Sequence, residues 1–403
     1  MVLLLLIIVG YLLGSINPGW IFGKLLKGID LRYVGTENAG TTNTFRQVGF
    51  FPAAITGIFD FAKGLLAIWL AWKLGVKDPW FLAAGIAAFF GHVFPFYLSF
   101  RGGQGNATLL GILGFLCYRI FSHIPVPINE LIGLGIVALS VYYIARDDEI
   151  VGLSVLPLAW VLLIKLLIVN PSLRLELAII LAMFIYMWAI GLRNTIKEKL
   201  LMLADHTKKQ LLHWRTIARP LAILIPIIYV YTSKETILWI LGILGIILIA
   251  LDLARLVSRG VNFFLFNTIK GLFKEKEKFR FSSMTFFMLA AFLAILLFEK
   301  DIAFLAITFI IFGDLAAKFF GAQFTRRIIL GERSLEGFVS YFSYCLFFGV
   351  FIGGLFSAPF WFVLLGAMAA SLTDLFSIFG IDDNFTVALI SGAVLTGIRF
   401  FVG

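Results

Sequence analysis

The sequence predicts an all-α polytopic membrane protein that consists of two helical-bundle domains, each with about seven transmembrane helices. Of its 403 residues, 61% are hydrophobic and only 14% are charged, and the mean hydropathy is +1.00. One soluble core cannot bury so much apolar surface. Apolar runs long enough to cross a bilayer recur along the whole chain and are separated by loops that contain Lys, Arg, Gly and Asn.

The apolar runs define fourteen expected spans. The first run, "VLLLLIIVGYLLG", has no basic region before it and no small-residue cleavage site after it, so we expect a retained span rather than a secretory signal. The spans are expected at residues 1–22, 51–73, 79–99, 105–121, 129–145, 150–169, 174–191, 218–232, 236–254, 283–298, 301–317, 337–356, 359–379 and 385–402.

The charge pattern indicates the orientation of the spans. A net charge of +10 could suit nucleic acid, but the 33 Lys and Arg residues are scattered over many loops. Most of them lie in loops that follow odd-numbered spans, which the positive-inside rule places in the cytoplasm. We therefore expect both termini outside and no nucleic-acid partner.

The most charged central segment, residues 193–219, separates seven expected spans from seven. Its charges suit an amphipathic cytoplasmic connector. The polar clusters of the two halves differ, and no internal repeat is visible, so we expect two different domains. Their expected bounds are residues 1–203 and 218–403, with a connector at 204–217. Cys117 and Cys345 lie far apart in apolar runs, which predicts packing roles rather than a disulfide or a zinc site.

The first cytoplasmic loop contains "GTENAGTTNTFR", residues 35–46. Hydroxyls, amides and backbone N–H groups next to a guanidinium can bind an oxyanion. The alternative is a solvated loop that uses Asn and Gly for turns, but the length of the loop and its density of donors favour binding. The candidate ligand-binding residues are Thr36, Asn38, Thr42, Asn43 and Arg46.

Two further clusters follow in the same half. Asp60 and Lys63 share one helical face inside an apolar segment, where ionisable groups line a cavity or form an ion pair. His92 precedes "SFRGGQGNATLLG", residues 99–111, by a few positions. This stretch is either a tight turn with a basic anchor or a phosphate cradle. A single histidine usually has a packing role, but because polar and basic clusters lie on both sides of it in the sequence, His92 is a candidate catalytic residue. The glycine-rich candidates are Arg101, Gly102, Gly103 and Gly105.

The order of these stretches, "GSINPGWIFGKLLKGIDLR", "VGTENAGTTNTFRQVG", "DFAKG" and "GHVFPFYLSFRGGQGNAT", resembles the acyl-phosphate:glycerol-3-phosphate acyltransferase family of bacterial seven-span enzymes. The resemblance covers about residues 10–200. It implies transfer of a fatty acyl group from acyl phosphate to the 1-hydroxyl of glycerol 3-phosphate, without a cofactor. It also implies a prokaryotic inner-membrane location, with the active site toward the cytoplasm. Because both substrates carry phosphate, two adjacent anion sites are expected, to which Lys63 and Arg193 also contribute.

The chain departs from the family pattern at several positions. The second motif of the family usually reads Lys-Gly-Gly-Lys-Gly, whereas this chain has Gln104 in place of the second lysine. In the third motif, "LRNTIKE", Leu192 and Thr195 replace the usual His and Asn, and Glu198 replaces Arg. Glu37 occupies a position that is usually Gly. These changes remove two cations and one imidazole from the expected substrate site.

The C-terminal half carries three polar clusters on the predicted cytoplasmic face. They are "IFGDLAAKFFGAQF", "GERSLEGF" and "GIDDNFTV". Asp314 and Lys318 are either functional or a helix-stabilising ion pair, and Asp-Asp-Asn could merely cap the last helix. Together, however, the clusters supply carboxylates for Mg²⁺ and arginines with glycines for phosphates.

The order of these clusters, preceded by "DLARL" and "KEKEKFRFSSMTFF", resembles the CTP-dependent lipid kinases that include dolichol, phytol and diacylglycerol kinases. The resemblance covers about residues 220–403 and implies transfer of the γ-phosphate of CTP to a lipid alcohol. It assigns Asp314, Asp382 and Asp383 to Mg²⁺, and Asp314 and Asp383 to catalysis; which acid deprotonates the alcohol stays open. The nucleotide-binding candidates are Lys318, Arg333, Ser334, Glu336, Gly337 and Asn384.

The two resemblances predict a bifunctional phospholipid-synthesis enzyme whose partners are acyl phosphate, glycerol 3-phosphate, CTP, a lipid alcohol and membrane lipids. Convergence on one product pathway favours diacylglycerol as the alcohol, while polyprenol and phytol stay open. One alternative is a C-terminal phosphatidate cytidylyltransferase with a degenerate acyltransferase domain. Another is a transporter whose path is lined by Asp60, Lys63, Lys165, Asp252 and Asp314.

Overall fold

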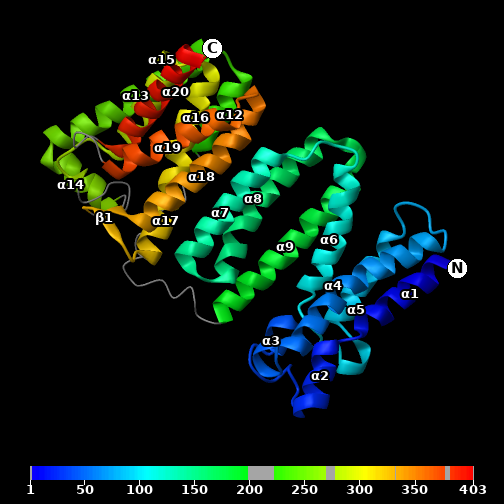
Figure 1. Cartoon of the computed structure of the whole chain (residues 1–403). Coiled ribbons are helices and arrows are strands. Elements are labelled where there is room, and N and C mark those ends of the chain that lie inside the picture. The colour runs from blue at the N-terminus through cyan, green and yellow to red at the C-terminus, as the bar shows by residue number, and fades with distance from the viewer. Residues whose placement is uncertain (1, 198–221, 269–276, 332, 377–381, 403) are drawn as a thin grey trace. The chain divides into compact units, whose positions relative to one another are not determined.

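The computed structural model describes residues 2–197, 222–268, 277–331, 333–376 and 382–402 (Figure 1). The expected connector at 204–217 lies outside the described residues. Within them, nine helical segments are long and apolar enough to cross a membrane, and four shorter apolar helices accompany them. The prediction of an all-α membrane protein is therefore confirmed. The span expected at 218–232 is represented by a short helix, α12 (Leu224–Tyr231).

The chain forms two compact units, and the first comprises residues 1–126 and 163–190. Its core is built from leucine, isoleucine and alanine side chains of α1, α4, α5, α6 and α9, with the end of α8 packed against them. The elements of this unit are α1 (Val2–Ser15), α2 (Pro18–Lys27), α3 (Thr41–Gln47), α4 (Phe50–Lys73), α5 (Leu82–Val93), η1 (Phe96–Leu98), α6 (Asn106–Phe121), the end of α8 (Asp148–Val169), η2 (Pro171–Leu173) and most of α9 (Arg174–Lys197).

The second unit comprises residues 127–162 and 191–403. Helices α18, α19 and α20, yellow to red in Figure 1, pack side by side at its centre. Besides α12 and the start of α8, its elements are α7 (Ile128–Ala145), α13 (Lys234–Val257), α14 (Arg259–Thr268), α15 (Ser283–Leu297), α16 (Lys300–Thr308), η5 (Phe309–Gly313), α17 (Asp314–Phe324), β1 (Ile328–Leu330), β2 (Arg333–Ser334), α18 (Leu335–Gly353), η6 (Gly354–Phe356), α19 (Phe360–Phe376) and α20 (Asp383–Val402).

The compact units do not follow the expected domain boundary. Helix α7 packs on α18, and Val137 and Val141 share a core cluster with Phe347. The compact units are defined by contacts, whereas the expected domains are defined by resemblance in sequence. The division of the chain into domains at residues 204–217 therefore stays a prediction.

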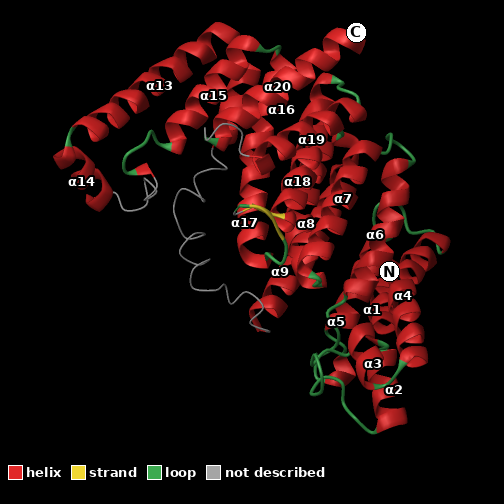
Figure 2. Ribbon diagram, turned by 60° about the vertical axis from the view of Figure 1, so that its left-hand side comes forward, coloured by secondary structure: helices red, strands yellow, loops and turns green. Residues whose placement is uncertain are grey.

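Three local features differ from the expected spans and loops. The expected first span is broken between α1 and α2, because Asn17 and Pro18 start a new helix: the Asn17 side chain accepts a hydrogen bond from the backbone N–H of Trp20 at 3.0 Å. Part of the expected loop 255–280 forms the helix α14. The expected loop before α18 forms an antiparallel hairpin, β1–β2, drawn in yellow beside α17 in Figure 2.

Small residues allow α1 and α5 to approach closely. A Cβ atom added at Gly10 would overlap the carbonyl group of Ala84, and one added at Gly14 would overlap that of Ala88. From the other side, a Cβ at Gly91 would overlap the carbonyl of Tyr11. Close helix packing through glycine is a common solution in membranes, where interfaces gain mainly from van der Waals contact. This contact holds the start of the chain against the helix that carries His92.

We predict that Gly14→Val separates α1 from α5 and destabilises the first unit by about 1–3 kcal/mol, since the added side chain meets backbone atoms that cannot move aside. Unfolding of the purified protein in detergent would measure the change. Gly114→Val is the matched control, because Gly114 on α6 has open space around its Cα. Equal stability of the two variants would contradict the close approach.

Candidate functional site

Asn43 organises the first polar loop. Its Nδ2 atom lies 2.9, 2.8 and 2.9 Å from the carbonyl oxygens of Leu31, Val34 and Asn38, and its Oδ1 atom accepts the backbone N–H of Thr36 at 3.2 Å. The side chain is buried. Since all of its polar atoms serve the loop, Asn43 shapes the candidate anion site rather than facing a ligand.

Two of the candidate ligand-binding residues of this loop are exposed on α3. Thr42 and Arg46 are four residues apart on that helix, and both side chains are exposed. They are therefore accessible to a ligand, and their role in binding stays a prediction. Glu37 adopts a left-handed backbone conformation with φ of 55°. This conformation is easiest for glycine, which explains why the family pattern has Gly at this position.

Arg32, which is paired with Asp30 inside the first loop, connects this loop to the segment before the glycine-rich loop by a hydrogen bond to the backbone. The Arg32 guanidinium contacts the Asp30 carboxylate at 2.9 Å and 2.7 Å, and its Nη1 atom donates to the carbonyl oxygen of Leu98 at 2.7 Å. The same guanidinium holds the pKa of Asp30 well below its usual range, so the pair stays charged near neutral pH. The two predicted anion loops are thus brought to the same end of the first unit.

The glycine-rich loop packs directly on the end of α5. The backbone N–H of Gly102 donates to the carbonyl of Val93 at 3.0 Å, and that of Gly103 donates to the carbonyl of His92 at 3.2 Å. A Cβ at Gly102 or Gly103 would overlap His92, and Gly105 has a positive φ of 80°. The glycines are needed for this packing. Arg101 stands exposed at the mouth of the loop and can meet a ligand.

A buried group of three ionisable side chains lies beneath the loop. Lys63 Nζ is 2.8 Å from Asp60 Oδ1 and 2.5 Å from His92 Nδ1, and it also donates to the carbonyl oxygens of Gly14 and Ile16 at 3.0 and 3.2 Å. Asp60, Lys63 and His92 are at most 2% exposed. The break between α1 and α2 leaves these carbonyls without helical partners, and the ammonium group satisfies them.

This contact determines the role open to His92. When Lys63 is charged its ammonium group only donates; Nδ1 of His92 is then the acceptor, and the ring proton is on Nε2, the atom that a Cβ at Gly103 would meet. His92 therefore supports the glycine-rich loop from below. Its assignment as a catalytic residue stays a prediction.

Three buried polar atoms around these loops have no hydrogen-bond partner among the described residues. They are Nδ2 of Asn17, Oδ1 of Asn106 and Oγ1 of Thr108. Asn17 starts α2, Asn106 starts α6 directly after the glycine-rich loop, and Thr108 packs on Gly64. Buried polar atoms usually have partners, so these groups are suited to a polar ligand. Asn17 and Thr108 were missed by the sequence analysis, because neither stands in a charged cluster.

Comparison with known proteins decides the family of this region. A family model described as "Glycerol-3-phosphate acyltransferase" matches residues 4–200. The glycerol-3-phosphate acyltransferase of Synechococcus sp. (strain CC9902) is 38% identical over 145 residues, which cover 34% of this chain and 72% of that protein. That of Trichlorobacter lovleyi is 41% identical over 148 residues, covering 37% and 72%. The chain belongs to the glycerol-3-phosphate acyltransferase family.

A solved structure is also similar to the acyltransferase-family region. The crystal structure of PlsY (YgiH), an integral membrane glycerol 3-phosphate acyltransferase, in its glycerol 3-phosphate form is 30% identical, with a TM-score of 0.37. The match covers 49% of this chain and 92% of that one. The family model ends at residue 200, so it leaves most of the second unit unmatched. Arg193, in the third family motif, is exposed and belongs to the second unit.

Several of the predicted C-terminal residues come together around one cavity in the second unit. Its volume is about 270 Å³, and its polar lining includes Lys318, Arg333, Ser334 and Gly337. Ser334 caps α18 by accepting the backbone N–H of Gly337 at 3.1 Å. A Cβ at Gly321 would lie 3.4 Å from the Cα of Gly337, so these glycines let α17 approach α18. The cavity thus combines two cations with a helix N-terminus.

Asp314 follows the π-helical turn η5, a type of irregularity common at functional sites. Its carboxylate lies 2.6 Å from Lys318 Nζ. The position of Asp314 is therefore compatible both with a helix-stabilising ion pair and with a functional role. Glu336 is buried, and its Oε2 accepts the backbone N–H of Arg327 at 3.4 Å, which connects α18 to the hairpin.

The acids at the start of α20 have different partners. Asp382 Oδ1 accepts the backbone N–H and the side-chain Nδ2 of Asn384 at 3.1 and 2.7 Å, which is a capping arrangement. Asp383 forms an ion pair with Arg333, and Nη1 of Arg333 also lies 3.1 Å from Asp374 Oδ2. Asp374 lines the cavity and was missed by the sequence analysis. In the sequence, Asp374 could have been noticed as a single acid within an expected apolar helix, in "SLTDLF".

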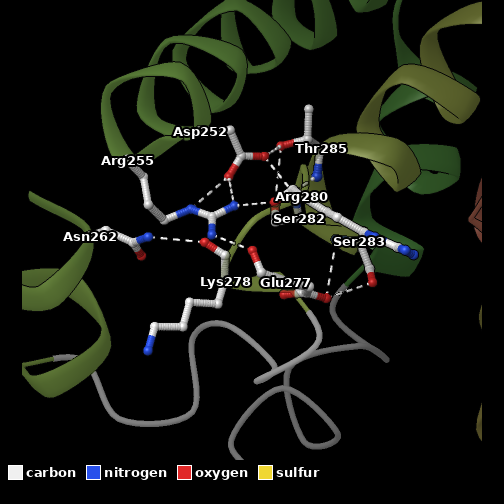
Figure 3. A network of polar contacts seen from close by, with 9 residues as sticks. All are labelled: Asp252, Arg255, Asn262, Glu277, Lys278, Arg280, Ser282, Ser283 and Thr285. Atoms are coloured by element: carbon white, nitrogen blue, oxygen red, sulfur yellow. Dashed lines mark hydrogen bonds and ion pairs between the residues drawn. The ribbon is translucent and has the colours of Figure 1, made fainter. Parts of the chain in front are cut away.

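A second buried network holds the segment before α15 (Figure 3). Asp252 accepts hydrogen bonds from Arg255 at 2.8 Å and from the backbone N–H of Ser282 and the hydroxyl of Thr285, both at 2.7 Å. Arg255 also donates to the backbone carbonyls of Glu277 and Arg280. Both charged side chains are buried. The motif "DLARL" therefore meets residues 277–283, the described part of the second motif, through a network that anchors the chain.

We predict that Lys63→Met destabilises the first unit by about 3–5 kcal/mol, because it leaves the Asp60 carboxylate buried without its cation. Unfolding in detergent would measure this change. Lys73→Met, at the exposed end of the same helix, should stay within about 0.5 kcal/mol of the parent. Adding Asp60→Asn to Lys63→Met should recover only part of the loss, since the carbonyls of Gly14 and Ile16 remain unsatisfied. If the single variant Lys63→Met were as stable as Lys73→Met, this role of Lys63 would be contradicted.

Proposed function

We propose that the chain is a bifunctional enzyme of phospholipid synthesis, and that its acyltransferase-family region transfers an acyl group from acyl phosphate to the 1-hydroxyl of glycerol 3-phosphate. Membership of the family is the observation that carries this proposal. The hydrogen bond from Arg32 to Leu98, which brings the two polar loops together, supports it, since both substrates carry a phosphate. The positive charge of the cytoplasmic loops supports an inner-membrane enzyme whose sites face the cytoplasm.

Arg46 and Arg101 are the exposed cations best placed to bind these phosphates. Because Gln104 is neutral where the family has lysine, the two arginines would carry a larger share of the phosphate charge. The amide of Asn17 and the hydroxyl of Thr108, which are buried beside the loops, suit the hydroxyl groups of a small polyol.

We further propose that the C-terminal part of the chain, residues 218–403, phosphorylates a lipid alcohol with CTP, as its resemblance to CTP-dependent lipid kinases implies. The cavity lined by Lys318, Arg333 and the start of α18 supports this proposal, because cations and a helix N-terminus suit a polyphosphate. Apolar side chains, Phe338 and Leu375, line the same cavity and suit a lipid.

The carboxylates of this region suit Mg²⁺ by the chemistry of their donors. Among the described residues, no group of three or more His, Cys, Asp or Glu side chains could hold a metal ion. A nucleotide-bound Mg²⁺ needs only one or two carboxylates, since phosphates complete its coordination. Asp314, with Asp382 or Asp383, would hold the ion, which when bound supplies charge neutralisation at the phosphates.

Labelled CTP tests the second activity. We expect the purified protein with Mg²⁺ and CTP labelled at the γ-phosphate to transfer the label to diacylglycerol or to a polyprenol. CTP labelled at the α-phosphate is the parallel arm, with phosphatidate as the acceptor. Label from the α-phosphate on phosphatidate would identify a cytidylyltransferase instead, and an absence of labelled lipid in both arms would refute the kinase.

Two substitutions should separate the activities. We expect Arg46→Ala to lower acyl transfer at least about 100-fold, because it removes a charge that stabilises bound phosphate, while CTP-dependent phosphorylation is retained. Asp314→Asn should have the opposite effect. Both reactions would be measured on each variant, with labelled glycerol 3-phosphate and γ-labelled CTP. Loss of both activities in either variant would argue against two independent sites.

A further inference from the structure

The cavity of the second unit has one acid in its wall among the described residues that line it, Asp374. Asp374 belongs to α19, is only 5% exposed and lines the cavity. It lies with Lys318, Arg333 and Ser334, the groups suited to a polyphosphate. An acid at this position is close both to the expected phosphates and to the apolar part of the lining.

The acids that the sequence singles out, Asp314, Asp382 and Asp383, do not line the cavity. The Asp314 carboxylate contacts Lys318, and Asp382 accepts two hydrogen bonds from Asn384. Asp383 pairs with Arg333 from the start of α20 and does not line the cavity. The geometry therefore separates Asp374 from the acids that the sequence singles out.

We infer that Asp374 is the general base that accepts the proton of the lipid hydroxyl; this inference rests on the kinase function proposed above. The hydroxyl oxygen forms a bond to the γ-phosphorus of CTP as its proton passes to a carboxylate oxygen of Asp374. The bond between the γ-phosphorus and the β,γ-bridging oxygen breaks, and CDP leaves with the electron pair. In phosphoryl transfer such an acid mainly orients the alcohol and receives its proton.

Arg333 prepares Asp374 for this role. Its Nη1 atom lies 3.1 Å from Asp374 Oδ2, and the same guanidinium is held by Asp383. A carboxylate buried beside apolar residues tends to take up a proton and would then accept none from the substrate. The adjacent cation favours the ionised form and fixes the orientation of the carboxylate. Arg333 is thus a positioning residue for Asp374 as well as a candidate phosphate ligand.

The test uses the full chain in lipid nanodiscs with Mg²⁺, γ-labelled CTP and either diacylglycerol or a polyprenol. We expect Asp374→Asn to lower kcat about 100-fold or more while the KM for CTP changes little. The rate of the parent should fall as the pH drops through the pKa of the base, and Asp374→Asn should lose this dependence. Asp374→Glu should regain activity with a displaced pH profile, even if the asparagine variant folds poorly.

Asp301→Asn is the matched control. Asp301 also pairs with an arginine, Arg399, with Asp301 Oδ1 3.0 Å from its Nη1, but it lies at the start of α16 and does not line the cavity. It should therefore keep the kcat and the pH profile of the parent. If Asp374 only stabilises the fold, both substitutions will lower the melting temperature and neither will change the pH profile.

The outcomes separate the two proposals. Failure of the parent to label either alcohol would overturn the kinase function itself, and with it the role of Asp374. Label transfer by the parent together with an unchanged pH profile in Asp374→Glu would overturn only the general base. A variant that needs more Mg²⁺ for half-maximal rate, at an unaltered pH profile, would make Asp374 a metal ligand and would also overturn the inference.

Discussion

The first unit depends on one buried ammonium group. Lys63 reaches the break between α1 and α2, where the carbonyls of Gly14 and Ile16 have no helical partner, and its charge is balanced by Asp60. An unsatisfied carbonyl or an unpaired charge at this depth would be costly. The same ammonium orients His92, on which the glycine-rich loop rests. One side chain thus connects the helix break to a ligand-facing loop.

The second unit uses cations in a similar way. Arg255 joins the end of α13 to the backbone of residues 277–280, and Arg333 joins the hairpin to acids of α19 and α20. Each guanidinium has several donors in a planar arrangement and can therefore hold two segments at once. The two arginines differ in access: Arg255 is fully buried, whereas Arg333 lines a cavity. Only Arg333 can therefore also bind a ligand.

Much of this architecture was predictable from sequence, because hydropathy and charge report directly on membrane spans. The clustering of Lys318, Arg333, Ser334 and Gly337 was also predictable, since all lie near span ends on one expected face. The break at Asn17 was missed, because the polar stretch "SINPG" was placed inside the first expected span, and its partner Lys63 lies 46 positions later. Asp374 was missed for a related reason. A single acid in an apolar helix gains its meaning only from the residues that the fold places around it.

The glycine-rich loop shows why a motif and its mechanism must be argued separately. Glycines beside a basic residue suggest that backbone N–H groups cradle a phosphate. Here the N–H groups of Gly102 and Gly103 donate to carbonyls at the end of α5, and a Cβ at either position would strike His92. The missing side chains thus serve the packing of the loop on a buried imidazole. A phosphate bound at this loop must therefore be held by side chains such as Arg101. The packing of the loop on the buried residues beneath it determines the position of the Arg101 charge.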